Sequence, residues 1–153
     1  MRLTEKKRAQ KALDALLREA PDRMLRLLEE GDLTRTLEQL REAEAPGPEW
    51  VRAKARNLRL KCGYACGELR ELEQALRGAL SAWEEAGCSD ALRTAQAGMM
   101  LEQIAAKTAE LRSIQERMTT LIRFADSAEE GARQADLLTA LAQLRSFGKE
   151  AAE

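Results

Sequence analysis

Few residues of this sequence could carry out chemistry. There is no histidine among its 153 residues, so the commonest general base and the commonest metal ligand are both absent. A base would have to be Asp, Glu, Lys or Tyr in a specialised pocket, and nearly all the acids fall on the polar faces of amphipathic helices. Neither the Walker nor the dinucleotide-binding glycine spacing occurs. We therefore expect no enzymatic activity and assign no catalytic residue.

Three cysteines, Cys62, Cys66 and Cys88, are the other reactive side chains. Cys62 and Cys66 lie one helical turn apart, but two thiolates fall short of the four ligands that zinc usually takes. An odd number of cysteines in a chain of this size is untypical of a disulfide framework. We interpret them as reduced structural cysteines and expect no metal, cofactor or small-molecule substrate. Without a leader pattern or a long apolar run, we expect a cytoplasmic protein that contacts no membrane.

The most distinctive charge pattern is a cluster of five cations with no acid among them. This basic strip consists of Arg52, Lys54, Arg56, Arg59 and Lys61. On a helix, Arg52, Arg56 and Arg59 lie on one flank of the apolar seam, and the two lysines lie on the other. Such a strip could contact phosphates or an acidic partner. We favour the alternative that its members pair with acids on neighbouring helices. The formal net charge of −1 argues against broad attraction to polyanions.

A second candidate surface, for packing on a protein partner, consists of bulky or flexible apolar side chains. Its members are Leu80, Trp83, Met99, Met100 and Met118. Methionine adapts to several partners, although ordinary core filling explains these residues equally well. Ala75, Leu80 and Ala82 also widen the apolar stripe there, and a stripe that wide needs more than one neighbouring helix.

The composition specifies the elements that must position these residues. Alanine (27) and leucine (24) supply most of the apolar content, while valine and isoleucine together contribute four residues. Sheets need β-branched and aromatic residues, so the sequence predicts an all-α fold. We expect one helical domain over 1–153. An antiparallel, coiled-coil-like hairpin (48–126) would be extended into a small bundle by short N-terminal helices (1–47) and a C-terminal helix (127–148).

The N-terminal part reads as three short helices. Thr4 can cap the first, and Pro21 is predicted to stop it because proline lacks the N–H that a continuing helix needs. A second helix over 22–30 would end at Gly31, and Asp32 would open a third with Leu33, Leu37 and Leu40 inward. The proline–glycine cluster at 45–48 ends this region.

The hairpin is predicted from apolar residues at alternating four- and three-residue steps. The first seam consists of Val51, Ala55, Leu58, Cys62, Ala65, Leu69, Leu72, Leu76, Ala79, Trp83 and Ala86. This period is typical of a helix that packs on another helix, here about 55 Å long. Gly63, Gly67 and Gly78 fall outside the seam. They could admit a third helix or mark a break near 62–67, and we favour a continuous helix.

A turn at 87–90 leads into the second long helix. Gly87 is predicted to end the first helix, and Ser89 or Asp90 to cap the next. The second seam consists of Ala97, Met100, Ile104, Lys107, Leu111, Ile114, Met118, Leu121 and Ala125. A turn this short requires an antiparallel course. Residues 127–130 fit a capping box for a last helix that ends at Gly148, with Leu137, Leu138, Leu141 and Leu144 inward.

Three functions remain compatible with these patterns. The first is a non-enzymatic helical adaptor or assembly subunit that acts through helix-packing contacts, as a homo-oligomer or in a hetero-complex. The second is a small subunit of a nucleoprotein complex that contacts a phosphate backbone through the basic strip. The third, an export or assembly chaperone, rests on architectural analogy alone. We favour the first, because an uncovered alanine-rich seam would be an exposed apolar patch.

Overall fold

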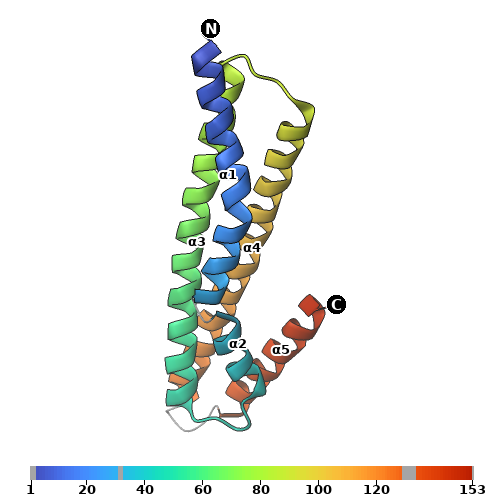
Figure 1. The fold of residues 1–153 in the computed structure, drawn as a ribbon. Coiled ribbons are helices and arrows are strands. Elements are labelled where there is room, and N and C mark those ends of the chain that lie inside the picture. The colour runs from blue at the N-terminus through green and yellow to red at the C-terminus, as the bar shows by residue number, and fades with distance from the viewer. Residues whose placement is uncertain (1–2, 31–32, 129–133, 153) are drawn as a thin grey trace. The chain divides into compact units, whose positions relative to one another are not determined.

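The computed structural model describes residues 3–30, 33–128 and 134–152, and within them it is helical with no strand. The helices are α1 (Leu3–Glu30), α2 (Leu33–Glu42), α3 (Pro48–Glu85), α4 (Ala91–Ala128) and α5 (Gln134–Ala152), as labelled in Figure 1. The all-α prediction is confirmed. Among these residues, no helix combines the length and the apolar character that crossing a bilayer requires.

The chain divides into two compact units, and each unit draws on two separate stretches of sequence. Unit 1 comprises Met1–Glu30 and Ala65–Glu110, and unit 2 comprises Gly31–Tyr64 and Leu111–Glu153. The division into 1–47, 48–126 and 127–148 does not coincide with these units, because α3 and α4 each contribute one part to both. The N-terminal region is also divided, since α1 belongs to unit 1 and α2 to unit 2.

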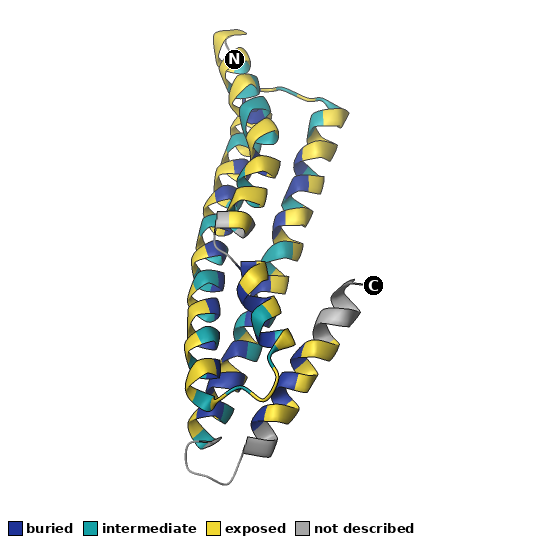
Figure 2. Ribbon diagram, turned by 60° about the horizontal axis from the view of Figure 1, so that its bottom comes forward, coloured by how far each residue is buried: buried dark blue, intermediate teal, exposed yellow. Residues whose placement is uncertain are grey.

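Both seams of the hairpin are buried almost throughout. Ten of the eleven residues of the α3 seam are buried and Ala79 is half-buried; in the α4 seam only Lys107 is half-buried. Figure 2 shows buried residues recurring along α3 and α4 with exposed residues between them. In unit 2 the two helices run antiparallel, because Arg52 on α3 reaches Asp126 on α4 while Arg59 reaches Thr119.

The turn between α3 and α4 has the geometry that the sequence predicts. Gly87 has a φ of +83°, and its N–H donates to the Glu84 carbonyl at 2.9 Å while the Cys88 N–H donates to the Trp83 carbonyl at 3.1 Å. This pair of bonds is a Schellman motif, which favours glycine at the left-handed position. Asp90 rather than Ser89 caps α4, because the Leu92 N–H donates to its side chain at 3.0 Å.

The unit 2 core is completed by α2 and α5. Leu33, Leu37 and Leu40 of α2 are buried, as are Leu137, Leu141 and Leu144 of α5. The Arg145 guanidinium of α5 donates to the carbonyls of Arg41 and Ala43. These carbonyls lie at the C-terminal end of α2, where a helix offers them no N–H of its own. Leu138 was expected to face inward but is 42% exposed, because on α5 the buried positions are 137, 140, 141 and 144.

The prediction that Pro21 stops the first helix is wrong. Residue 21 lies inside α1, which continues to Glu30, so the expected helices 3–20 and 22–30 are one element. Proline removes one backbone hydrogen bond, at a cost of about 3 kcal/mol. Packing overrides it, because Leu13 and Ala20 on the same helix are fully buried in unit 1. The expected end at Gly31 and start at Asp32 lie outside the described residues.

Two smaller boundary predictions also differ from the structure. Ser127 lies within α4, where its hydroxyl donates to the Arg123 carbonyl at 3.0 Å, so it does not cap the last helix. Glu129 and Glu130 of the expected capping box lie outside the described residues. Gly148 does not end α5, which runs to Ala152. The favoured continuous helix is confirmed for α3, which passes through Gly63, Gly67 and Gly78 without interruption.

Candidate functional site

The inward members of the basic strip contact neighbouring helices of unit 2. The Arg52 side chain is 16% exposed, and its Nε donates to Asp126 Oδ1 on α4 at 2.6 Å. Arg59 Nη1 lies 3.5 Å from the hydroxyl of Thr119, which is also on α4. Lys54 Nζ donates to Gln39 Oε1 on α2 at 3.0 Å and lies 5.9 Å from the centroid of the Trp50 ring. These cations therefore help to hold α2, α3 and α4 together.

The outward members of the strip border an apolar pair that the sequence analysis missed. Leu60 and Tyr64 lie one turn apart on α3, with 75% and 70% of their surfaces exposed. Arg56 is exposed and Lys61 half-buried. At 100° per residue, these two cations lie on opposite sides of the Leu60–Tyr64 line. We call Ala53, Arg56, Asn57, Leu60 and Tyr64 the outer face. Bulky apolar residues between the seam steps are the sequence signal that could have revealed it.

The structure does not bring the second candidate surface together. Trp83 and Met100 are buried in unit 1, Met118 is buried in unit 2, and Leu80 is half-buried. Only Met99 is strongly exposed, at 61%. Trp83, Met100 and Met118 are therefore core residues, which is the alternative that the sequence left open, whereas Met99 is not.

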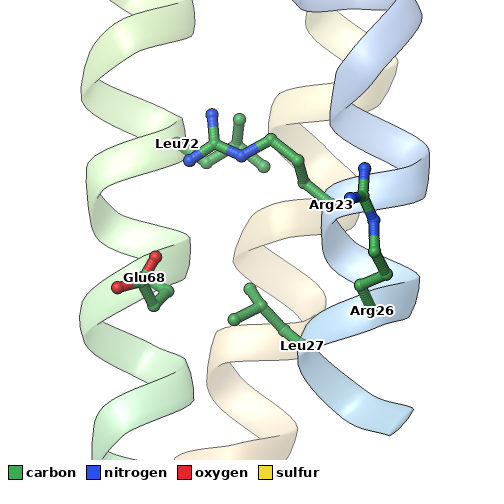
Figure 3. A pocket seen from close by; sticks show the side chains of 5 residues that line it. All are labelled: Arg23, Arg26, Leu27, Glu68 and Leu72. Carbon is green, nitrogen blue, oxygen red and sulfur yellow. The ribbon is translucent and has the colours of Figure 1, made fainter. Parts of the chain in front are cut away.

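A small recess in unit 1 combines charges of both signs. It has a volume of about 140 Å³ and is lined by Arg23, Arg26 and Leu27 of α1 and by Glu68 and Leu72 of α3. In Figure 3 the Arg23 side chain extends from α1 toward Leu72, whereas the Arg26 side chain does not point toward Leu72. Glu68 is the only acid among the lining residues, so the recess lacks the paired carboxylates of general acid–base catalysis.

Two larger grooves of unit 1 lie along α1. One, of about 410 Å³, is lined by Asp14, Leu17, Arg18, Gln96 and Met100. The other, of about 390 Å³, lies between α1 and the end of α3 and is predominantly apolar. Its lining consists of four alanines, Ala9, Ala12, Ala82 and Ala86, together with Glu5, Arg8 and Glu85. We call this second space the alanine groove.

The strongest electrostatic perturbation in the described part of the chain is structural. Arg93 on α4 donates to Asp14 Oδ1 on α1 at 2.8 Å and also contacts Asp90. The Leu92 N–H and the Arg93 guanidinium lower the pKa of Asp90, and the two carboxylates raise the pKa of Arg93. Because this cluster joins a helix cap to α1, it stabilises unit 1 and offers no reactive group.

The cysteines and acids form no metal centre among the described residues. Cys62 is buried, Cys66 and Cys88 are half-buried, and none of these three cysteines forms a disulfide within the described residues. The Cys88 sulfur lies 3.8 Å from the Lys6 carbonyl oxygen in unit 1. The outer face, with its exposed Leu60 and Tyr64, and the alanine groove both differ in composition from an ordinary solvated helix. Comparison of the chain with family models, curated proteins and solved structures gives no match.

Proposed function

We propose that this protein is a non-enzymatic adaptor or assembly subunit that binds protein partners through the outward faces of its helices. The observation that carries the proposal is the exposure of Leu60 and Tyr64, at 75% and 70%, on the outer face of α3. Cysteines that form no disulfide fit a reducing compartment such as the cytoplasm. No reactive constellation competes with this proposal among the residues described.

The composition of the outer face resembles the centre of a protein–protein interface. Tyrosine and arginine are enriched in such centres, and acids are depleted there. Tyr64 and Arg56 are both on this face, and no acid occurs between Trp50 and Gly67. Small neighbours at Ala53 and Asn57 let a partner helix approach the leucine and the tyrosine. Packing of these apolar side chains would supply the affinity, and the flanking charges would select the partner.

The nucleoprotein alternative is the weaker proposal. Arg52, Lys54 and Arg59 each have an intramolecular contact, to Asp126, Gln39 and Thr119 respectively. A phosphate would have to compete with those contacts. Arg56 and Lys61 would then supply most of the affinity, and two phosphate contacts bind only weakly at physiological salt.

A capture experiment with a matched control tests the adaptor function. The full chain and its Leu60→Glu variant are used as baits in lysate of the native host. Leu92→Glu is the control, because Leu92 is 66% exposed on α4 in unit 1 and lies outside the outer face. We expect Leu60→Glu to lose a protein that the wild type and Leu92→Glu both retain. Identical captured proteins for all three baits would contradict the proposed role of this face.

A further inference from the structure

The glycines of α3 are the starting point for a more specific inference. Each glycine inside a helix is unfavourable relative to alanine, so its presence needs a reason. At Gly63 the chain itself supplies the reason, since an added Cβ would lie 3.0 Å from Gln115 Nε2. At Gly67 and Gly78 an added Cβ would meet nothing within 4 Å. The described part of the chain therefore does not account for these two glycines.

Gly78 lies one helical turn before Ala82, which lines the alanine groove of unit 1. It is exposed, and because of this spacing both residues belong to the same side of α3. The absence of side-chain bulk at both positions would allow another helix to come close to the α3 backbone. Among its lining residues Glu5 and Glu85 are acids and Arg8 is the one cation, so the lining carries a net negative charge. The groove thus suits an apolar helix face that carries positive charge.

The outer face of unit 2 has this chemistry. Leu60 and Tyr64 are the bulky apolar residues, Arg56 is the exposed cation one turn before Leu60, and the stretch between Trp50 and Gly67 contains no acid. The two surfaces are complementary in size, because one has large side chains where the other has glycine and alanine. They are also complementary in charge, because Arg56 borders one and Glu85 borders the other.

We infer that the occupant of the alanine groove is the outer face of a second copy of this chain. The two α3 helices would run antiparallel at this contact, with Leu60 of one copy at Ala82 of the other. The spacing then places Tyr64 over Gly78 and Arg56 beside Glu85, since both pairs are one turn away from the Leu60–Ala82 level. This inference rests on the proposed adaptor function and names the partner of the outer face.

The glycine can be tested without weakening the fold. Gly78→Gln fills the space that Tyr64 would occupy, and it favours the helix because the new Cβ has no atom of another described element within 4 Å. Gly98→Gln is the matched control, since an added Cβ at Gly98 on α4 also meets nothing within 4 Å. By sedimentation velocity we expect the wild type and Gly98→Gln to self-associate. Gly78→Gln should associate about tenfold more weakly or worse, with an unchanged or raised melting temperature.

A charge-reversal pair tests the register of the contact. Arg56→Glu places a carboxylate opposite Glu85, and Glu85→Arg places a guanidinium opposite Arg56, so each variant alone should remain monomeric. A mixture of the two variants restores opposite charges at every Arg56–Glu85 contact and should recover the association. Double-variant complementation of this kind requires that these two residues meet.

Three results would overturn the inference. They are a wild-type chain that stays monomeric at high concentration, an association that Gly78→Gln leaves unchanged, and a mixture of the charge variants that does not associate. The adaptor function is judged separately by the capture experiment. If the wild type is monomeric but Leu60→Glu still loses a host protein, the self-contact is wrong and the adaptor function stands.

Discussion

Gly67→Ala and Gly63→Ala are expected to change stability differently, although both replace a glycine inside α3. Alanine is favoured over glycine in a helix interior by about 0.5–1 kcal/mol. At Gly67 the new Cβ meets nothing within 4 Å, so the whole gain should appear in the free energy of unfolding. Because residue 67 lies within the register proposed for self-association, the comparison is made on monomeric protein, so that the measurement reports on the helix alone.

At Gly63 an intramolecular contact opposes the same gain. The new Cβ would lie 3.0 Å from Gln115 Nε2, which donates to the Arg59 carbonyl at 3.3 Å. Displacing the amide loses a hydrogen bond worth about 0.5–1.5 kcal/mol. The two effects are of similar size, so Gly63→Ala should leave the free energy of unfolding unchanged or slightly lowered.

Urea unfolding followed by far-UV circular dichroism measures both differences. We expect a higher midpoint with an unchanged slope for Gly67→Ala and no increase for Gly63→Ala. In a Gln115→Ala background the obstructing amide is gone, and Gly63→Ala should then recover the full helix gain. If Gly63→Ala stabilises the wild type as much as Gly67→Ala does, the contact between α3 and α4 at Gln115 is refuted.

Three further predictions follow from other parts of the chain. Pro21→Ala should raise the free energy of unfolding by about 1–3 kcal/mol, because α1 is continuous there and would gain a hydrogen bond. A lower free energy of unfolding for this variant, measured by urea denaturation, would mean that α1 breaks at residue 21. The pKa of Asp90 is lowered in the folded state, so its contribution is present above its ordinary value of 3.8 and is lost as the pH falls through the folded value. As the pH falls into the acid range, the free energy of unfolding should therefore decrease more steeply for the wild type than for Asp90→Asn. Equal slopes of the free energy of unfolding against pH would contradict the cap. Replacing Arg52, Arg56 and Arg59 with glutamine should lower the free energy of unfolding by about 1 kcal/mol or less, chiefly through the lost Arg52–Asp126 pair, with no nucleic-acid binding before or after. Wild-type binding with a salt slope of about −0.9 per phosphate would instead support the nucleoprotein function.

The sequence by itself determined the helical class and both hairpin seams. The four- and three-residue steps from Val51 to Ala86 identify buried positions because a helix returns to the same face at that period. Gly87 and Asp90 were also predictable, since turn and cap geometry depends on a few adjacent residues. The positions of the basic strip on the two flanks of the α3 seam follow from the same period.

Tertiary packing decided the features that local rules do not reach. Pro21 lies inside α1 because burial of Leu13 and Ala20 outweighs a lost backbone bond. Periodicity does not distinguish a seam residue that packs within the chain from one left for a partner, so Trp83 and Met100 could be recognised as core only in the structure. The exposure of Leu60 and Tyr64 could likewise be recognised only in the structure, because it depends on how the other helices of unit 2 pack around α3. Local spacing specifies the face of a helix, whereas only the packed chain specifies which faces remain uncovered.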